Sequence, residues 1–276
     1  MWKKILSILL IGGCVALIAF CAFQIFETLQ ERFLSKQEYS KTREEYVSAI
    51  NNEDRPDKKK AAAEGSEVTE EDEESEYPDF NVDIEGLMAK NPDFAAWVYY
   101  KDGGVDYPIV QEQADALDRY LTTTFDGNTN PSGCPFIAYD ADISFRYQNT
   151  FIYGHNMKDG SIFGTLKKVY HDPSNALDPY FYIWTRDGKV MKYRVFAAYV
   201  VEDDSPMYAI PFSDDTYDKY INEAFSHGVF NTYVAFTKEE REAMNKRNPI
   251  VTLSTCYGSA GTSKRLLIQG VQIGKK

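Results

Sequence analysis

The pattern of hydrophobic and polar positions begins with one long apolar stretch. Residues 5–26 are 22 consecutive uncharged, mostly apolar positions. As a helix they would span about 33 Å, which is enough to cross the hydrocarbon core of a membrane. Lys3 and Lys4 precede this stretch and Glu27 follows it. The sequence therefore predicts a single-pass transmembrane anchor over residues 1–26, with a cytoplasmic N-terminus and the rest of the chain outside the cell.

A cleaved signal peptide is the alternative to an anchor. The apolar run of a signal peptide normally covers 7–15 residues and ends at a small-x-small cleavage site. The run in this chain is longer and ends in the bulky sequence Phe23-Gln24-Ile25-Phe26. The pattern thus favours an anchor that is retained.

Two segments separate the anchor from the rest of the chain. Residues 27–50 carry apolar positions at roughly helical spacing among charges, which predicts a membrane-proximal helix. We expect this helix to form a stalk; the alternative is that it packs on the folded body. Residues 51–79 lack periodicity, and residues 64–76 include eight acidic side chains and no basic one. Such a block repels itself and predicts a disordered spacer. A chain that begins near Tyr77 is then expected to fold by itself.

From Phe80 onward, short runs of β-branched and aromatic residues alternate with turn signals. A short helix is expected over residues 82–90, a helical insertion over residues 214–227, and a further turn or two over residues 238–245. Eight strands in fewer than 200 residues favour a closed or nearly closed antiparallel barrel. The sequence thus predicts a mainly β domain over residues 80–276. The expected strands cover residues 96–100, 107–111, 135–139, 150–153, 180–184, 190–202, 249–254 and 265–273.

Composition and charge exclude several classes of function. The formal net charge is −12, from 30 basic and 42 acidic residues, which argues against a nucleic-acid partner. Most of the excess lies in residues 51–79, where 12 acidic residues accompany 4 basic ones. The chain has three histidines, no Cys-x-x-Cys pair and no glycine-rich phosphate loop. We therefore expect neither a metal ion nor another cofactor.

Two of the four cysteines lie outside the apolar stretch, and one of them is placed as a nucleophile would be. Cys256 ends a predicted buried strand and is followed closely by Gly258. A strand end holds a side chain firmly while leaving it open to a substrate. Cys134 stands before Pro135 at the start of a strand, which indicates a small packing residue. A disulfide between the two cysteines is the alternative.

A nucleophilic cysteine needs a base or an imidazolium partner, and each of the three histidines is a candidate. His171 stands in a polar loop, and His227 ends the helical insertion. His155 follows a strand and Gly154, which permits a tight turn that opens the ring to a cleft. The pattern favours His155.

A third group should stabilise the negative charge of a tetrahedral intermediate. Arg265 opens the last strand, nine residues after Cys256 and across a connection rich in glycine and serine. A hairpin of that length would bring the two residues side by side. The alternative is an ordinary solvated or ion-paired arginine.

These motifs together resemble those of the sortases, the membrane-anchored cysteine transpeptidases of Gram-positive bacteria. The resemblance rests on Thr252-Leu253-Ser254-Thr255-Cys256, on Arg265 and on Tyr153-Gly154-His155-Asn156-Met157. Asn91-Pro92-Asp93 and the helical insertion resemble class B in particular, and the likeness covers roughly residues 80–274.

The resemblance implies an eight-stranded sortase-type barrel with an N-terminal helix and a helical insertion before the cysteine strand. Cys256 would be the nucleophile, and Arg265 would bind the oxyanion and the substrate. His155 would protonate the leaving amine and later activate the incoming one. The resemblance also suggests Leu121, Tyr208 and Ser254 as residues of the substrate groove, and Tyr257 stands where some class B enzymes carry an acidic residue.

The implied substrates are secreted surface proteins or pilins that carry a C-terminal sorting signal. Cleavage after the threonine of that signal would give a thioester, which an amine of a peptidoglycan precursor or a pilin lysine would resolve. One alternative is an extracellular Cys-His protease that uses water as the acceptor. Another is an adhesion module without catalytic activity.

Overall fold

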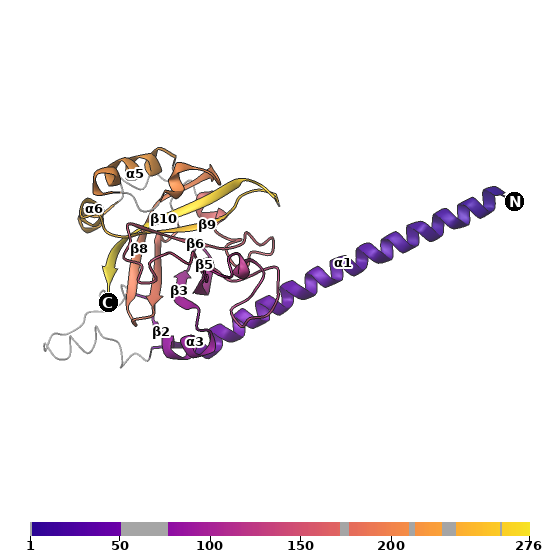
Figure 1. Cartoon of the computed structure of the whole chain (residues 1–276), viewed down its shortest axis with the longest axis horizontal. Helices are drawn as coiled ribbons and strands as arrows, with labels where there is room; N and C mark the ends of the chain where they lie inside the picture. The colour runs from indigo at the N-terminus through magenta and orange to yellow at the C-terminus, as the bar shows by residue number, and fades with distance from the viewer. Residues whose placement is uncertain (1, 51–76, 172–176, 210–212, 228–235, 260) are drawn as a thin grey trace.

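The computed structural model describes residues 2–50, 77–171, 177–209, 213–227, 236–259 and 261–276. A long helix, α1 (Trp2–Tyr46), extends from a β-barrel that carries short helices on its surface (Figure 1). The acidic spacer expected over residues 51–79 lies outside the described residues, apart from its last three positions.

Eight strands close the barrel in the order β10-β8-β7-β3-β4-β5-β6-β9, which confirms the predicted fold class. Each predicted strand is present, with its ends moved by a few residues because side-chain pattern alone defines boundaries poorly. The strands are β3 (Phe94–Tyr100), β4 (Val105–Gln111), β5 (Phe136–Ile137), β6 (Asn149–Tyr153), β7 (Tyr180–Thr185), β8 (Val190–Glu202), β9 (Ile250–Cys256) and β10 (Lys264–Lys275).

The expectation of an antiparallel barrel is wrong for two strand pairs. Strands β4 and β5 are parallel neighbours, and so are β6 and β9. Parallel neighbours need a long crossover between them. The chain supplies one in the long connection between β4 and β5, and another in the path from β6 to β9, which passes through β7, β8 and three α-helices. As a result, β6 and β9 end at the same edge of the barrel.

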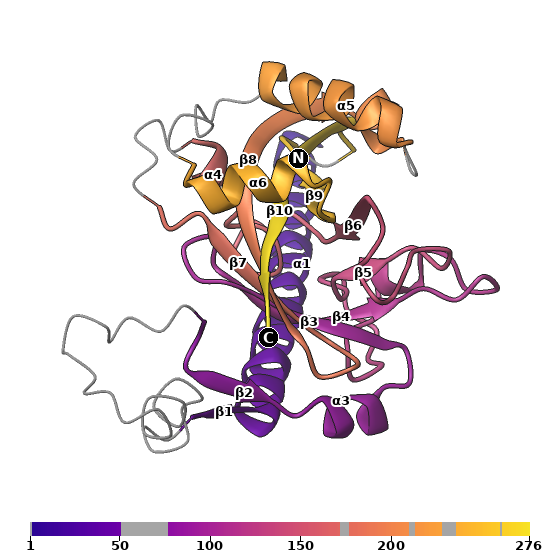
Figure 2. The same cartoon turned by 90° about the vertical axis from the view of Figure 1, so that its left-hand side faces the viewer.

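Helices cover two opposite sides of the barrel. Helices α5 (Asp214–His227) and α6 (Lys238–Asn245) lie over one side, where the helical insertion was predicted (Figure 2). Helix α3 (Ile84–Lys90) and the two-stranded ribbon of β1 (Val47–Ala49) and β2 (Phe80–Val82) lie on the other. The chain pattern did not reveal this ribbon, because its strands are three residues long and far apart in sequence. Three further turns of helix are α4 (Lys167–Tyr170), η3 (Arg119–Leu121) and η4 (Pro206–Tyr208).

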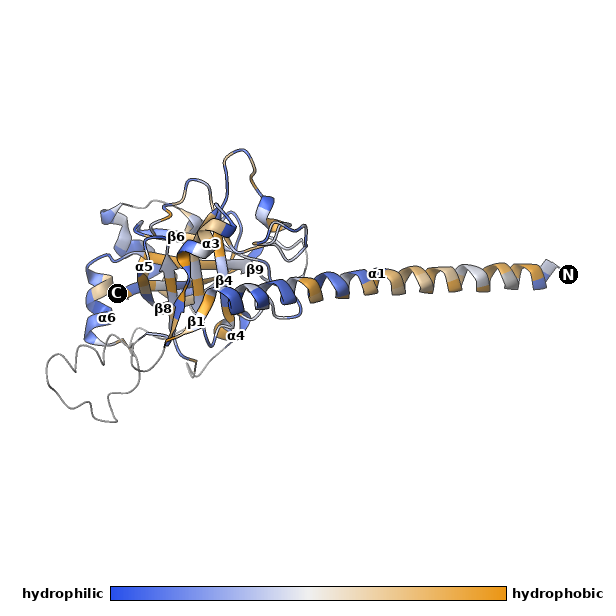
Figure 3. Ribbon diagram, turned by 90° about the horizontal axis from the view of Figure 1, so that it is seen from below, coloured by the Kyte–Doolittle hydropathy of each residue, from blue (hydrophilic) through white to orange (hydrophobic). Residues whose placement is uncertain are grey.

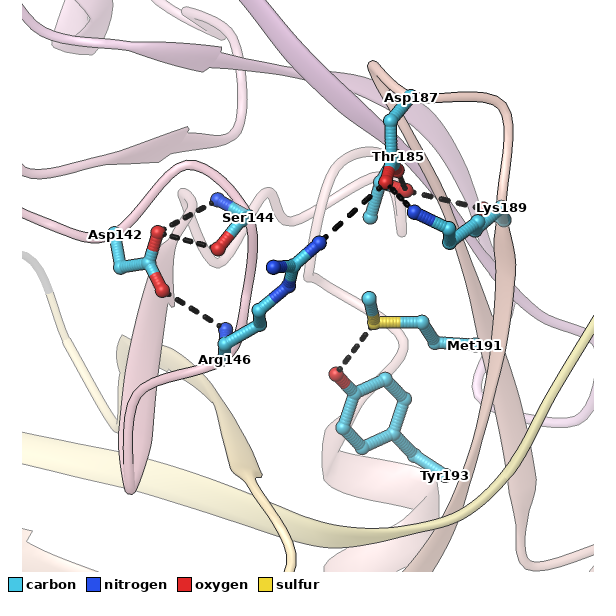
Figure 4. A network of polar contacts seen from close by, with 8 residues as sticks. All are labelled: Asp142, Ser144, Arg146, Thr185, Asp187, Lys189, Met191 and Tyr193. Atoms are coloured by element: carbon cyan, nitrogen blue, oxygen red, sulfur yellow. Dashed lines mark hydrogen bonds and ion pairs between the residues drawn. The ribbon is translucent and has the colours of Figure 1, made fainter.

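A polar network fixes the loop that leads into β6. The Asp142 carboxylate accepts hydrogen bonds from the backbone N–H and hydroxyl of Ser144 and from the backbone N–H of Arg146 (Figure 4). The guanidinium of Arg146 then reaches Asp187, in the turn between β7 and β8, at 3.7 Å. Lys189 pairs with the same carboxylate. These contacts hold the start of β6 against the β7–β8 hairpin.

Helix α1 has two parts, and the second packs on the barrel. Its N-terminal part is almost entirely apolar, whereas polar residues appear where the helix reaches the body (Figure 3). The apolar part is long enough to cross a membrane. Ser35, Tyr39 and Thr42 recur every three or four residues and are buried against the barrel, as is Val47 just after the helix. The preference for a free stalk over residues 27–50 is therefore wrong, and the packed alternative holds.

The packing of α1 changes what is expected of a shortened chain. A chain that begins at Tyr77 should unfold at lower urea than one that begins at Glu27. Burial of Tyr39 and Val47 is lost in the shorter chain. Full burial of a large apolar side chain stabilises by about 1.5–3 kcal/mol, so the free energy of unfolding should fall by about 3 kcal/mol or more. Equal unfolding midpoints with equal slopes would show that the helix adds nothing to the domain.

Candidate active site

The parallel pairing of β6 with β9 places two of the predicted site residues at neighbouring strand ends. Tyr153 is the register partner of Ser254. One residue further, the Gly154 N–H donates to the Ser254 carbonyl at 3.1 Å, and the Thr255 hydroxyl donates to the Gly154 carbonyl at 2.7 Å. His155 comes next, just after the end of β6, and Cys256 is the last residue of β9. The structure thus brings together residues that are about a hundred positions apart in sequence.

Glycine at position 154 is required by close packing. A Cβ atom there would lie 2.7 Å from Cδ2 of the buried Phe163 ring. The His155 carbonyl accepts a hydrogen bond from the Phe163 N–H at 3.0 Å, so the chain turns back at this point. This turn leaves the His155 side chain partly exposed at the barrel end.

The two cysteines outside α1 have opposite surroundings. Cys256 is exposed, whereas Cys134 is buried and its thiol donates to the Pro108 carbonyl at 3.6 Å. Burial raises the pKa of the Cys134 thiol well above its ordinary value, which disfavours the reactive thiolate. Both cysteines are free, so the alternative of a disulfide between them is wrong.

His155 is held by a backbone carbonyl. Its Nε2 lies 2.8 Å from the carbonyl oxygen of Leu121, in the short helix η3. Because a carbonyl only accepts hydrogen bonds, Nε2 carries the proton, and Nδ1 is the nitrogen left for proton exchange. Leu121 was expected as a groove residue; the contact that the structure records is between its carbonyl and His155.

The other two histidines contact different partners. His171 is exposed, and its Nε2 lies 3.4 Å from the hydroxyl of Tyr257. His227 pairs with Glu223 at 2.8 Å and stacks on the ring of Tyr199. Neither follows a strand that pairs with β9.

Arg265 is the register partner of Cys256 in the β9–β10 hairpin, as the spacing predicted. Directly opposite residues in an antiparallel pair have Cβ atoms about 5 Å apart. The Arg265 guanidinium donates to the Thr262 carbonyl at 2.6 Å and to the Asp203 carboxylate at 3.0 Å. Asp203 was not among the expected site residues. The feature that could have indicated Asp203 is its position directly after β8, because β8 is the other strand that pairs with β10.

Ser254 and Tyr208 form a polar contact beside these residues. Their hydroxyl oxygens lie 2.7 Å apart, and the Tyr208 ring packs on Phe151 with centroids 5.0 Å apart. Burial raises the pKa of Tyr208, while the Ser254 hydroxyl and the charge of Arg265 act in the opposite sense. A negative charge on Cys256 adds to the rise of the Tyr208 pKa.

Comparison with known proteins decides the family. The Sortase domain model matches residues 101–273, which is more than half of the chain. The chain belongs to the sortase family. Sortase B of Listeria monocytogenes is 29% identical over 197 residues, covering 70% of this chain and 75% of that protein. Sortase B of Staphylococcus aureus is 25% identical over 193 residues, covering 67% and 72% respectively.

Solved structures agree with this assignment. A crystal structure of a Bacillus anthracis protein similar to sortase B superposes with a TM-score of 0.58 at 28% identity, covering 71% of this chain and 84% of that one. The chain is therefore a class B sortase, and hence a cysteine transpeptidase of the kind that acts on sorting signals. Among the residues described, this sortase has no group of three or more potential metal-ligating His, Cys, Asp or Glu side chains.

Proposed function

We propose that this sortase cleaves the C-terminal sorting motif of secreted proteins after threonine and transfers the new acyl end to an amine. The supporting observation is the register at the barrel end. His155 and Cys256 follow paired positions of parallel strands, and Arg265 lies opposite Cys256. The proposed nucleophile, proton carrier and positive charge therefore lie close together at this end of the barrel.

In the first step the Cys256 thiolate attacks the threonine carbonyl carbon. The electron pair of the C=O bond moves to oxygen, and the Arg265 guanidinium stabilises this oxyanion. The oxyanion then collapses, the C–N bond breaks, and His155 delivers a proton from Nδ1 to the leaving amine. The products are a thioester on Cys256 and a released C-terminal fragment.

In the second step an amine attacks the thioester carbonyl. Neutral His155 accepts a proton from the amine at Nδ1, a C–N bond forms and the C–S bond breaks. The Cys256 thiolate is regenerated, so the cycle consumes no cofactor. Leu121, Tyr208 and Ser254 would line the groove for the sorting motif. Support for this comes from the contact between Ser254 and Tyr208 beside Cys256 and Arg265.

The proposed acceptor is an amine of a peptidoglycan precursor or of a pilin lysine, and the proposed setting is the outer surface of the membrane. We place the anchor at residues 1–26, with a cytoplasmic N-terminus and the catalytic domain outside. The hairpin between β9 and β10 points to the side on which the apolar part of α1 extends (Figure 1). This direction favours substrates that arrive at the membrane surface.

The test uses a peptide with a threonine sorting motif and hydroxylamine as the added amine. A transpeptidase converts the peptide to a hydroxamate at the threonine, which mass spectrometry detects. The alternative function is an extracellular Cys-His protease, which uses water as its acceptor and would keep the free carboxylate as its main product when hydroxylamine is present. Absence of hydroxamate with continued hydrolysis would therefore contradict the proposal.

A further inference from the structure

Just after its apolar stretch, helix α1 packs on the long connection between β4 and β5, residues 112–135. The hydroxyl oxygens of Ser35 and Ser132 lie 2.5 Å apart, and the Tyr39 hydroxyl donates to the Gly133 carbonyl at 2.5 Å. Ser35 is 2% exposed and Tyr39 is 6% exposed. Burial raises the pKa of Tyr39 well above its ordinary value, so the phenol keeps its proton and remains a donor.

Further contacts extend this attachment along the helix. The side-chain amide of Asn130 donates to the Glu31 carbonyl at 2.9 Å. The Glu38 carboxylate accepts hydrogen bonds from the backbone N–H of Asp126 at 3.1 Å and from the side chain of Asn128 at 3.0 Å. One face of α1 thus holds the whole segment from Asp126 to Gly133.

This held segment packs directly against η3. The Cys134 N–H donates to the Tyr120 carbonyl at 2.9 Å, and the Asn130 N–H donates to the Thr122 carbonyl at 2.9 Å. Gly133 has a φ of +59°, and a Cβ atom there would lie 2.2 Å from the Tyr120 oxygen and 2.9 Å from the Leu121 oxygen. The position of the Leu121 carbonyl therefore depends on the position of Gly133.

The Leu121 carbonyl is the group that fixes the His155 ring. Its oxygen accepts from Nε2 at 2.8 Å. A hydrogen bond to one imidazole nitrogen decides which tautomer forms and how the ring is turned. A continuous series of contacts therefore joins the Tyr39 hydroxyl to His155 Nε2 through Gly133 and Leu121.

A second series of contacts reaches His155 from its other side. Lys36 Nζ lies 3.2 Å from the Asp159 carboxylate, in the turn that follows His155. The Tyr39 ring packs edge-on against Tyr107 with centroids 5.2 Å apart. The hydroxyl of Tyr107 accepts from the Ile162 N–H at 3.0 Å. The same helical turn of α1 therefore contacts the segment around Gly133, which packs on Leu121, and the turn after His155, which contains Asp159.

We propose that Ser35 and Tyr39 of α1 are positioning residues for His155. Through Gly133 and the Leu121 carbonyl they keep the ring protonated at Nε2, with Nδ1 available to the substrate. The inference rests on the proposed role of His155. It gives α1 a part in catalysis beyond anchoring, because the helix that leaves the membrane also orients the proton carrier.

The test compares the double variant Ser35→Ala/Tyr39→Phe with Arg43→Ala, both in the full chain in detergent micelles. Arg43 is the matched control because it also joins α1 to the barrel, through the Asp106 carboxylate at 2.5 Å. That contact reaches β4 and does not touch Gly133, Leu121 or His155. Both variants should lower the unfolding midpoint, whereas only the double variant should alter His155.

The expected result has a kinetic part and a spectroscopic part. In the double variant kcat should fall about tenfold with KM nearly unchanged, because a misplaced catalytic group slows the chemical step. Nitrogen-15 spectra of the three histidines, with His155 assigned from His155→Gln, should show the Nε2–H form of His155 replaced by a mixture of tautomers. Arg43→Ala should leave both kcat and the His155 spectrum unchanged.

Two outcomes would overturn the inference. One is a double variant with wild-type kcat and an unchanged His155 tautomer. The other is an equal fall of kcat in Arg43→Ala, which would trace the effect to lost helix packing. A separate experiment tests the proposed function itself. If the single variant His155→Ala still transferred the acyl group, the proposed role of His155 would be wrong, whatever the result for α1.

Discussion

Replacement of Cys256 by alanine is expected to abolish acyl transfer, whereas Cys134→Ser should retain most of it. Cys256 is exposed at the end of β9 and would form the bond to the substrate. Loss of the nucleophile in a protease triad lowers kcat by a factor on the order of 10⁶, and a comparable loss is expected for Cys256→Ala. The measurement is kcat with a sorting-motif peptide, together with mass spectrometry of the trapped acyl-enzyme.

Cys134→Ser is the matched control for this experiment. The buried side chain at position 134 donates to the Pro108 carbonyl, and a serine hydroxyl can keep that hydrogen bond. The substitution should therefore affect stability more than turnover. Equal losses of activity in both variants, with both proteins folded by circular dichroism, would contradict the assignment of Cys256 as the nucleophile.

Arg265→Lys is expected to lower kcat by a factor on the order of 10² or more, although the positive charge is kept. The guanidinium offers several donors in a fixed plane, and a lysine ammonium does not reproduce that geometry. In the structure two of these donors already reach Thr262 and Asp203, which fixes the plane of the group beside Cys256. Lysine would lose this orientation and, with it, the donor that we propose for the oxyanion.

Asp203→Asn separates orientation from charge stabilisation. The pair of Asp203 with Arg265 is partly exposed, and such pairs contribute about 0–1 kcal/mol. The substitution should therefore lower kcat by no more than about fivefold. If Arg265→Lys were as active as Asp203→Asn, Arg265 would have no role at the oxyanion and would serve as a surface charge.

Local patterns in the sequence were enough to predict the main elements of this sortase. The 22-residue apolar run, the eight strands and the helices over residues 214–227 and 238–245 follow from local periodicity, which depends only on neighbouring side chains. The motifs around Cys256 and His155 were sufficient to suggest the family. The hairpin spacing also predicted that Arg265 would lie opposite Cys256, because a short connection leaves few possible registers.

Which distant segments are neighbours follows from the three-dimensional structure alone. The parallel pairing of β6 with β9 joins segments about a hundred residues apart, and no local pattern encodes such a pairing. Asp203 reaches Arg265 because β8 is the second neighbour of β10. The burial of Ser35 and Tyr39 likewise depends on a surface built by residues 126–133. A polar helix face looks the same in sequence whether water or a barrel covers it, so the link from α1 to His155 became visible only in three dimensions.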